Sequence, residues 1–407
     1  MAFDAGEHTS STTGPSTRLS RRTLLKGAAA VVAAGTLTMP GSIASAATSA
    51  EPPNDLDAFI LDRMHRARVP GLAAAVIADG GLRWSKGYGR ANIRRSLAAT
   101  ADTPFMLASV SKTVMAVALM QVVESGALGL DDDIDEHLPF GVRNPNAPAA
   151  PITARMLLTH TSSLRDNWRV LTQVYVRGDS PVPLGSFLRD YLAPGGRFYD
   201  SRRNFGQDPP LTEYRYCNVG AALGGYLVEA VTGTPFDRHC DERIFGPLGM
   251  RATGWHLADL GRRSVAMPYR FDATSRTYRP YGQYGYPDYP DGELRTGAAH
   301  LARFLGAFAG FGTWKGTRIL GSSTAREMRR RQFPRIAHGQ GLIWYYERRG
   351  ADLLLGHNGG DSGVNTRMFF RPRDGVGVIV LANGDGSGDG ALAEVQDRLF
   401  EVFGAER

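Results

Sequence analysis

Ser109 and Lys112 are the residues whose types and spacing most directly suggest chemistry. They form a Ser-x-x-Lys segment at the start of an apolar stretch with helical periodicity over 114–124. This spacing puts both side chains on one face of a helix, one turn apart. A serine hydroxyl becomes a strong nucleophile only when a neighbouring group takes its proton, and a lysine can do so if burial or a nearby cation lowers its pKa. Only four of the 47 lysine and arginine residues are lysines, which favours proton transfer at Lys112 over the alternative, an N-capping serine beside a solvated lysine.

Tyr216 and Asn218 flank Cys217 at the entrance of an expected helix over 219–231. From a turn at a helix entrance, a phenol and an amide two residues apart can project into one cleft. The alternative is an asparagine cap beside a packed tyrosine.

The segment His357-Asn358-Gly359-Gly360 follows a short apolar stretch over 353–355 that is typical of a strand. Glycines at the end of a strand would let a substrate approach the backbone closely and would leave an N–H group free to donate. The alternative is a turn between two strands.

The remaining pattern indicates the elements that position these segments. Helices are expected over 55–66, 114–124, 152–158, 219–231, 298–311 and 392–403, and strands over 71–78, 82–88, 341–346, 353–355, 366–370 and 376–381. The residues Asp79-Gly80-Gly81 predict a hairpin between the first two strands. Because strands lie at both chain ends, the sequence predicts an α+β fold. One antiparallel sheet would be formed by both chain ends and flanked by N- and C-terminal helices, with a mainly helical region over about 110–310 inserted between them.

Composition excludes several classes of protein. The 407 residues are 43% hydrophobic and 21% charged, which argues against wholesale disorder, a collagen-like repeat or a coiled coil. Two cysteines are too few for a disulfide scaffold, and whether Cys217 and Cys240 pair is left open. The net charge of +7 includes a single run of three basic residues, Arg329–Arg331, so no nucleic-acid partner is expected. The nine histidines are scattered, and neither a metal nor an organic cofactor is predicted.

The N-terminal residues 1–46 resemble a twin-arginine export signal. Arg21 and Arg22 precede an apolar stretch of about 13 residues, and Ala44-Ser45-Ala46 offers small residues for cleavage near Ala46. The alternative is an uncleaved anchor, but a spanning helix needs about 20 apolar residues. We therefore expect export across the cytoplasmic membrane by the twin-arginine machinery, a linker over 47–54, and no stable membrane anchor after cleavage.

Taken together and in this order, the three segments resemble those of the serine β-lactamase / DD-peptidase / esterase family, closest to its class C branch. Three further stretches are similar to the family: 126–132, 157–164 and 244–250. The resemblance covers residues 55–405 and implies a β-lactamase/transpeptidase-like domain.

The resemblance also implies roles for the site residues. Ser109 corresponds to the acylated nucleophile, Lys112 to its activating base, and Tyr216 to the group that relays protons. Asn218 corresponds to the side chain that orients the substrate amide. The backbone N–H groups of Ser109 and Gly360 correspond to the oxyanion hole.

His357 departs from the family, because it replaces the lysine of the Lys-Thr-Gly element whose glycine corresponds to Gly359. With Asn218 and Gly360, these two residues are expected to bind substrate. The family's lysine is taken to face a substrate carboxylate, so the replacement argues against efficient β-lactam hydrolysis. A histidine with a pKa near ~6.5 would handle anionic substrates better towards pH 6 than at pH 8. Arg295 is the residue that could supply a positive charge instead.

The sequence therefore predicts an exported serine hydrolase that works through an acyl-serine on small esters or peptides, as an esterase, DD-peptidase or D-aminopeptidase-like enzyme. One alternative is an acyl transferase, either a transpeptidase or a peptide cyclase, using the same site. Another is a penicillin-binding sensor or scaffold that acylates without turnover.

Other features are given structural interpretations. Gly360-Asp361-Ser362-Gly363 and the segment ending in His300 mimic a chymotrypsin-like protease, but only 61 residues separate Ser362 from His300. His160 is expected to be a buried, hydrogen-bonded histidine. Five tyrosines between 278 and 289 form either a binding wall or a loop that packs on itself.

Overall fold

The computed structural model describes residues 55–261, 265–386 and 390–404. The expected signal and linker, residues 1–54, lie outside the described residues. Within the described part of the chain, no helix is both long enough and apolar enough to cross a membrane.

A seven-stranded sheet is built from both ends of the described chain, as the sequence predicts. Its strands are β1 (Gly71–Ala78), β2 (Gly81–Asn92), β3 (Leu97–Ala98), β13 (Tyr345–Arg349), β14 (Asp352–Asp361), β15 (Val364–Phe370) and β16 (Gly377–Ala382). Their order is β13-β14-β15-β16-β1-β2-β3, and every neighbouring pair is antiparallel. The two halves join where β1 pairs with β16, for example at Val76 and Val378.

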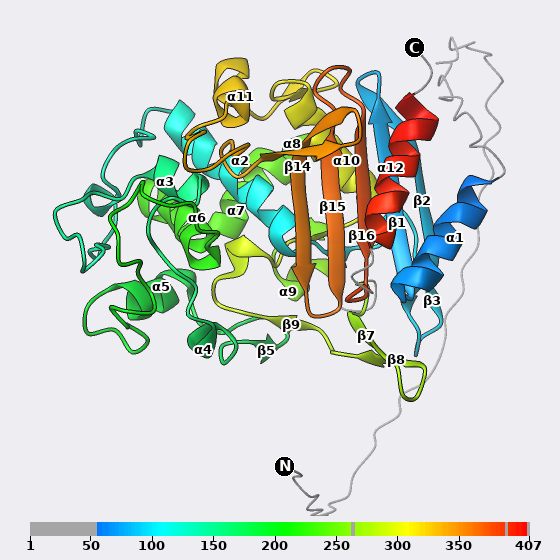
Figure 1. Cartoon of the computed structure of the whole chain (residues 1–407), viewed down its shortest axis with the longest axis horizontal. Coiled ribbons are helices and arrows are strands. Elements are labelled where there is room, and N and C mark those ends of the chain that lie inside the picture. The colour runs from blue at the N-terminus through cyan, green and yellow to red at the C-terminus, as the bar shows by residue number, and fades with distance from the viewer. Residues whose placement is uncertain (1–54, 262–264, 387–389, 405–407) are drawn as a thin grey trace, which may run out of the picture. The chain divides into compact units, whose positions relative to one another are not determined.

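Helices cover both faces of this sheet (Figure 1). Because successive side chains of a strand point to opposite faces, Ala74 and Val76 belong to one apolar cluster, whereas Ala73 and Ala75 belong to another. The first cluster is covered by α1 (Leu56–Ala67) and α12 (Ala391–Gly404), which pack on each other. The second is covered by α10 (Ala298–Ala309) and continues into the inserted region.

The inserted region is mainly helical, as expected, and carries several two- to four-residue strands. Its helices are α2 (Ser111–Glu124), α3 (Ala154–Leu158), α4 (Trp168–Leu171), α5 (Leu184–Leu192), α6 (Asn218–Thr232), α7 (Phe236–Cys240), α8 (Gly246–Leu248) and α9 (Leu257–Leu260), and α11 (Ser322–Arg329) follows α10. The short strands are β4 (Phe105–Met106), β5 (Val176–Arg177), β6 (Thr253–Gly254), β7 (Tyr269–Asp272), β8 (Thr277–Pro280), β9 (Tyr284–Gly285), β10 (Arg295–Thr296), β11 (Thr313–Trp314) and β12 (Thr317–Arg318).

The prediction of a strand over 341–346 is wrong for most of that range. Leu342, Ile343 and Trp344 are fully buried in a loop, and β13 begins only at Tyr345. Trp344 stacks on Phe308 of α10 with ring centroids 3.8 Å apart. The apolar run thus reflects burial beneath α10 rather than strand pairing.

Candidate active site

The structure brings Ser109 and Lys112 together at the start of α2. Ser109 lies in the short 3-10 turn Ala108–Val110, and Lys112 lies in the first turn of the helix. The Lys112 side chain is completely buried, and its Nζ donates to Ser109 Oγ at 3.0 Å and to the backbone carbonyl of Asp291 at 2.6 Å. The serine is therefore held beside a buried ammonium group, at the spacing that the sequence suggests.

Ala108, directly before the nucleophile candidate, has a backbone conformation that is unfavourable for a residue with a side chain. Its φ is 47°, in the left-handed region. The side chain is buried in a small apolar cluster that includes Tyr284 and Tyr286. Packing thus holds the turn that presents Ser109, and two of the five clustered tyrosines take part in it.

The electrostatics of Lys112 differ from the expectation. Burial favours the neutral amine, but the neighbouring Tyr216 and Asp291 outweigh it, so the pKa of Lys112 is raised rather than lowered. The Asp291 carboxylate lies 4.0 Å from Nζ. Lys112 is therefore protonated in the resting site and acts there as a hydrogen-bond donor and positive charge.

Asn218 is oriented by Asp166, a residue that sequence reasoning missed. The Asp166 carboxylate accepts from the Asn218 side chain at 2.9 Å, and also from the backbone N–H groups of Asn218 and Val219 at the first turn of α6. The N-cap of this helix is Cys217, whose Sγ accepts from the N–H of Gly220. A carboxylate at a helix N-terminus is stabilised by these donors and by the helix dipole.

Tyr216 lies between Lys112, His160 and His357. Lys112 Nζ is 5.2 Å from the centroid of its ring, and the ring centroids of His160 and His357 are 4.4 and 6.2 Å away. His160 is 2% exposed, and its Nδ1 accepts from the N–H of Cys217 at 3.3 Å. His160 is thus the buried, hydrogen-bonded histidine that was expected, and its ring packs against the ring of Tyr216.

His357 is neutral in this site, for two structural reasons. Burial, reinforced by the charge of Lys112 and only partly opposed by the Asn358 carbonyl, lowers the pKa of His357 to about 4. Nδ1 lies 2.5 Å from the Asn358 carbonyl oxygen and must therefore carry the hydrogen. The expectation of an ordinary pKa is wrong, and in the neutral ring Nε2 is a hydrogen-bond acceptor rather than a cation.

His357, Gly359 and Gly360 lie within β14, which is longer than the predicted strand and extends to Asp361. At Gly359 a Cβ atom would lie 2.4 Å from the Leu107 carbonyl oxygen and 3.0 Å from the Ser109 nitrogen. At Gly360 a Cβ atom would meet nothing within 4 Å. The strand therefore packs directly against the nucleophile turn at Gly359 and faces open space at Gly360.

Two neighbouring cavities open at Ser109, and Tyr216 and Gly360 line both of them. The first, here the histidine lobe, has a volume of about 500 Å³ and includes His357 and Tyr345. The second, here the aspartate lobe, has a volume of about 720 Å³ and is further lined by Asn218, Tyr175, Tyr286, Trp168 and the aspartates 166, 288, 291 and 361. Ser109, Tyr216 and Gly360 thus lie where the two lobes meet, whereas His357 and Gly359 line only the histidine lobe and Asn218 lines only the aspartate lobe.

Arg295 lines neither lobe, which corrects the suggestion that it could supply a positive charge. It is fully buried and donates to the carbonyl groups of Trp255, Glu293 and Tyr284. The protease-like arrangement is also absent from the cleft. Ser362 lies in the turn after β14 and lines the aspartate lobe, whereas His300 lies on α10 and lines neither lobe.

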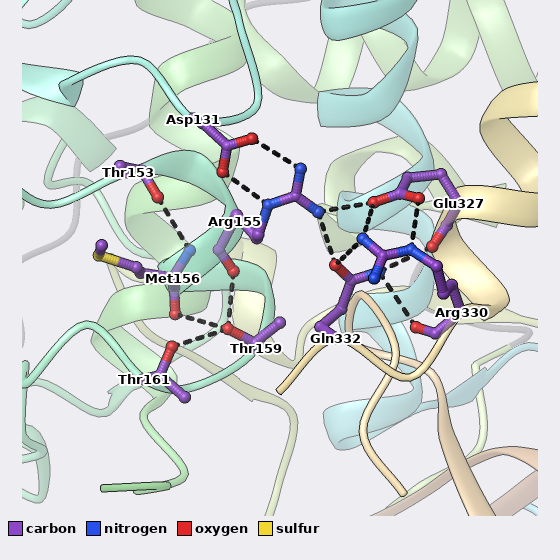
Figure 2. A network of polar contacts seen from close by, with 9 residues as sticks. All are labelled: Asp131, Thr153, Arg155, Met156, Thr159, Thr161, Glu327, Arg330 and Gln332. Atoms are coloured by element: carbon purple, nitrogen blue, oxygen red, sulfur yellow. Dashed lines mark hydrogen bonds and ion pairs between the residues drawn. The ribbon is translucent and has the colours of Figure 1, made fainter. Parts of the chain in front are cut away.

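A polar network, drawn in Figure 2, anchors Gln332, which precedes a loop that lines the histidine lobe. Arg155 of α3 bonds to Asp131, to Glu327 of α11 and to Gln332, and Arg330 bonds to the last two. The loop that follows Gln332 lines the histidine lobe. The network therefore ties this loop to the helix that leads to His160.

Both cysteines are free and buried, so the pairing left open by the sequence does not occur. Among the residues that the structure describes, no group of three or more histidine, cysteine or acidic side chains is placed to hold a metal ion.

Comparison with known proteins agrees with this geometry. The family model "Beta-lactamase" matches residues 56–401. Penicillin-binding protein 4 of Amycolatopsis lactamdurans is 31% identical over 339 residues, which cover 78% of this chain and 81% of that protein. The chain belongs to the β-lactamase/transpeptidase-like family of serine hydrolases.

Solved structures show the same β-lactamase/transpeptidase fold. The D-amino acid amidase of Ochrobactrum anthropi SV3 aligns with a TM-score of 0.67 and 24% identity, over 87% of this chain and 100% of that one. A penicillin-binding protein of Bacillus halodurans aligns with a TM-score of 0.68 and 21% identity, over 86% of this chain and 100% of that one.

Proposed function

We propose that this family member is a serine hydrolase that forms an acyl-enzyme at Ser109 and acts on small esters or peptides. The observation that carries the proposal is the 3.0 Å hydrogen bond from Lys112 Nζ to Ser109 Oγ, in a cleft that also contains Tyr216 and Gly360. A hydroxyl beside a buried ammonium and a phenol is suited to nucleophilic catalysis.

In the proposed reaction, Ser109 Oγ attacks the substrate carbonyl carbon, and its proton passes to Tyr216 because the protonated Lys112 cannot accept one. The Lys112 ammonium, 5.2 Å from the centroid of the Tyr216 ring, offsets the negative charge of the phenolate oxygen that accepts this proton. The N–H groups of Ser109 and Gly360 bind the developing oxyanion. Tyr216 returns the proton to the leaving group, the acyl-enzyme forms, and a water activated in the same way releases the acid.

Peptides, amides and esters fit this proposal better than β-lactams. The neutral His357 places no cation beside a substrate carboxylate in the histidine lobe, and the amidase of O. anthropi is an enzyme for D-amino acid amides. Transfer of the acyl group to an amine, as in a transpeptidase or cyclase, uses the same atoms and remains the second candidate. A penicillin-binding sensor that acylates without turnover is a third.

We further propose that the protein is exported through the twin-arginine pathway. The support is the Arg21-Arg22 pair followed by the apolar stretch and Ala44-Ser45-Ala46. Replacing both arginines by lysine in the full chain should leave the protein in the cytoplasm, and export that continues unchanged would contradict the proposal.

The activity is tested with a panel of p-nitrophenyl esters, D-amino-acid p-nitroanilides and nitrocefin, each with and without an amine acceptor. We expect turnover of esters or anilides and little turnover of nitrocefin. Products joined to the amine would favour the transferase. A stable adduct at Ser109 without turnover would favour the sensor, and efficient nitrocefin hydrolysis would contradict the inference from His357.

A further inference from the structure

The aspartate lobe is strongly acidic for a substrate cavity. Four carboxyl groups from three segments of the chain line it, namely Asp166, then Asp288 and Asp291 in one turn, and Asp361. No lysine or arginine is among the described residues that line the lobe. The Lys112 ammonium lies behind the lobe's wall, 4.0 Å from Asp291.

Three of these carboxyl groups have partners within the fold. Asp166 accepts from the N–H groups at the start of α6 and from Asn218. Asp361 accepts from the hydroxyls of Tyr175 and Tyr286 and from the N–H of Ser362. Asp291 faces Lys112. These contacts explain how three acidic side chains are tolerated at the wall of a cavity.

Asp288 has hydrogen-bond partners in its own backbone and in Asp291, but no basic partner within the described part of the chain. It is 4% exposed, and no basic side chain of the described residues lies within ion-pair distance of it. Its neighbours are themselves acidic. Burial, together with the charges of Asp166 and Glu293, raises the pKa of Asp288 to about 7, although hydrogen bonds from its own N–H and from Asp291 oppose the shift. A buried carboxyl that lines a cavity without a cation is costly unless the cavity's occupant supplies one.

Aromatic rings complete the lobe. Trp168, Tyr175 and Tyr286 line it together with the carboxyl groups. The faces of such rings attract cations, and the attraction is stronger for groups removed from water. Negative charge and aromatic faces in one cavity suit an ammonium group.

The position of the lobe indicates which part of a substrate it receives. A carbonyl carbon attacked by Ser109 bears an acyl substituent and a leaving group, and each of the two lobes can take one. Tyr216 lines both lobes and does not decide between them. His357, in the place of the family's carboxylate-facing lysine, lies in the histidine lobe, so a leaving group with a terminal carboxylate is assigned to that lobe. Asn218 and the four aspartates lie in the other lobe, so the acyl substituent extends there.

We propose that the aspartate lobe selects substrates whose acyl part carries an ammonium group. The free α-amine of an N-terminal residue and the side-chain amine of a lysine-like residue both supply this chemistry. The inference rests on the proposed acyl-serine function and deepens it, because it names the substrate class. Acyl groups that carry a carboxylate in the same position would be repelled.

Two matched pairs of p-nitroanilides test the proposal and separate the two sources of the amine. D-Alanine anilide is compared with N-acetyl-D-alanine anilide, and Nα-acetyl-D-lysine anilide with Nα-acetyl-D-norleucine anilide. An ammonium group bound in the lobe would gain a charge-assisted hydrogen bond and an ion pair with an aspartate. We therefore expect kcat/KM to favour the cationic member of at least one pair by about tenfold or more. Equal values within both pairs would overturn the inference and leave the acyl-serine function standing.

Variants locate the preference in the lobe. Asp288→Asn should bring the ratio of kcat/KM within the preferred pair close to one. Asp361 is partly exposed, so Asp361→Asn is the second variant in case Asp288→Asn does not fold, and it should lower the same ratio. Asp208→Asn removes the same charge from an exposed position outside the lobe and should keep the wild-type ratio. A ratio that survives both lobe variants would overturn the inference.

A fluorophosphonate probe distinguishes failure of the inference from failure of the proposed function. If no anilide is turned over but the probe labels Ser109, the four compounds are compared as competitors of labelling. The cationic members should then protect Ser109 at about tenfold lower concentrations, and equal protection would overturn the inference. Absence of both turnover and labelling would instead contradict the acyl-serine function itself.

Discussion

Gly359 and Gly360 are adjacent in β14, yet the same substitution should be damaging at Gly359 and nearly neutral for stability at Gly360. In Gly359→Ala the new Cβ would lie 2.4 Å from the Leu107 carbonyl oxygen and 3.0 Å from the Ser109 nitrogen. Ordinary van der Waals contact begins at 3.4 Å. Because both neighbours are backbone atoms, the strand or the nucleophile turn must move by roughly 1 Å, and neither can escape by a side-chain rotation.

The size of the effect follows from two known costs. Overpacking of this kind lowers the free energy of unfolding by about 1–3 kcal/mol. A displaced oxyanion donor costs about 100- to 1,000-fold in kcat, so we expect kcat/KM of Gly359→Ala to fall by about 100-fold or more. Gly360→Ala adds a methyl group in open space and keeps its N–H group, so its unfolding free energy should change by no more than about 0.5 kcal/mol.

The assay is steady-state hydrolysis of the best p-nitrophenyl ester or anilide, with urea unfolding of both variants. Gly360→Ala is the matched control, because it adds the same methyl group one residue away. A Gly359→Ala variant as active and as stable as wild type would refute the close packing of β14 on the nucleophile turn. The same conclusion would follow if Gly360→Ala were the more damaged of the two.

Three further results are expected. Tyr216→Phe should lower kcat by about 100- to 10,000-fold, as for the loss of an acid–base group, whereas Tyr214→Phe in the same lobe should stay within a few-fold. An active Tyr216→Phe enzyme would return the base role to the lysine. Because burial lowers the pKa of His357 to about 4, the preference between a free-acid and a methyl-ester leaving group should not change from pH 8.5 to 5.5. A transition near pH 6.5 that His357→Lys abolishes would show that the imidazole titrates normally. The hydrogen bond from Arg330, opposed by burial, lowers the pKa of Glu327 to about 2. The resulting stabilisation is present above about pH 4.5 and is lost as pH falls towards 2. Solvent screening at this partly exposed pair limits it to about 1 kcal/mol, so Arg330→Met should lose about that much at pH 7 and nothing near pH 2 in chemical unfolding.

Local patterns were sufficient to predict the sheet and the helices that cover it. The hairpin at Asp79-Gly80-Gly81 is formed as predicted. The two chain ends are joined by the pairing of β1 with β16, whose last residue pair is Ile77 with Gly377. Ser109 and Lys112 could be paired from their spacing alone, because helix geometry fixes which side chains share a face.

Features that depend on contacts between distant segments could not be read in this way. The polar residues His357 to Asp361 do not form an apolar strand pattern, but pairing with β15 extends β14 through them. Lys112 was expected to have a lowered pKa, and the opposite shift arises from Tyr216 and from Asp291, which belong to distant segments of the chain. Asp166 and Asp288 gave no sequence signal, because single aspartates in loops are common at protein surfaces.

The central claim is that Ser109 is the residue acylated by substrate. The most direct measurement is intact mass and peptide mapping of the protein after reaction with a fluorophosphonate probe or an activated ester. We predict a single adduct on the peptide that contains Ser109, and no adduct with Ser109→Ala. An adduct on Ser362, or labelling that persists in Ser109→Ala, would contradict the account.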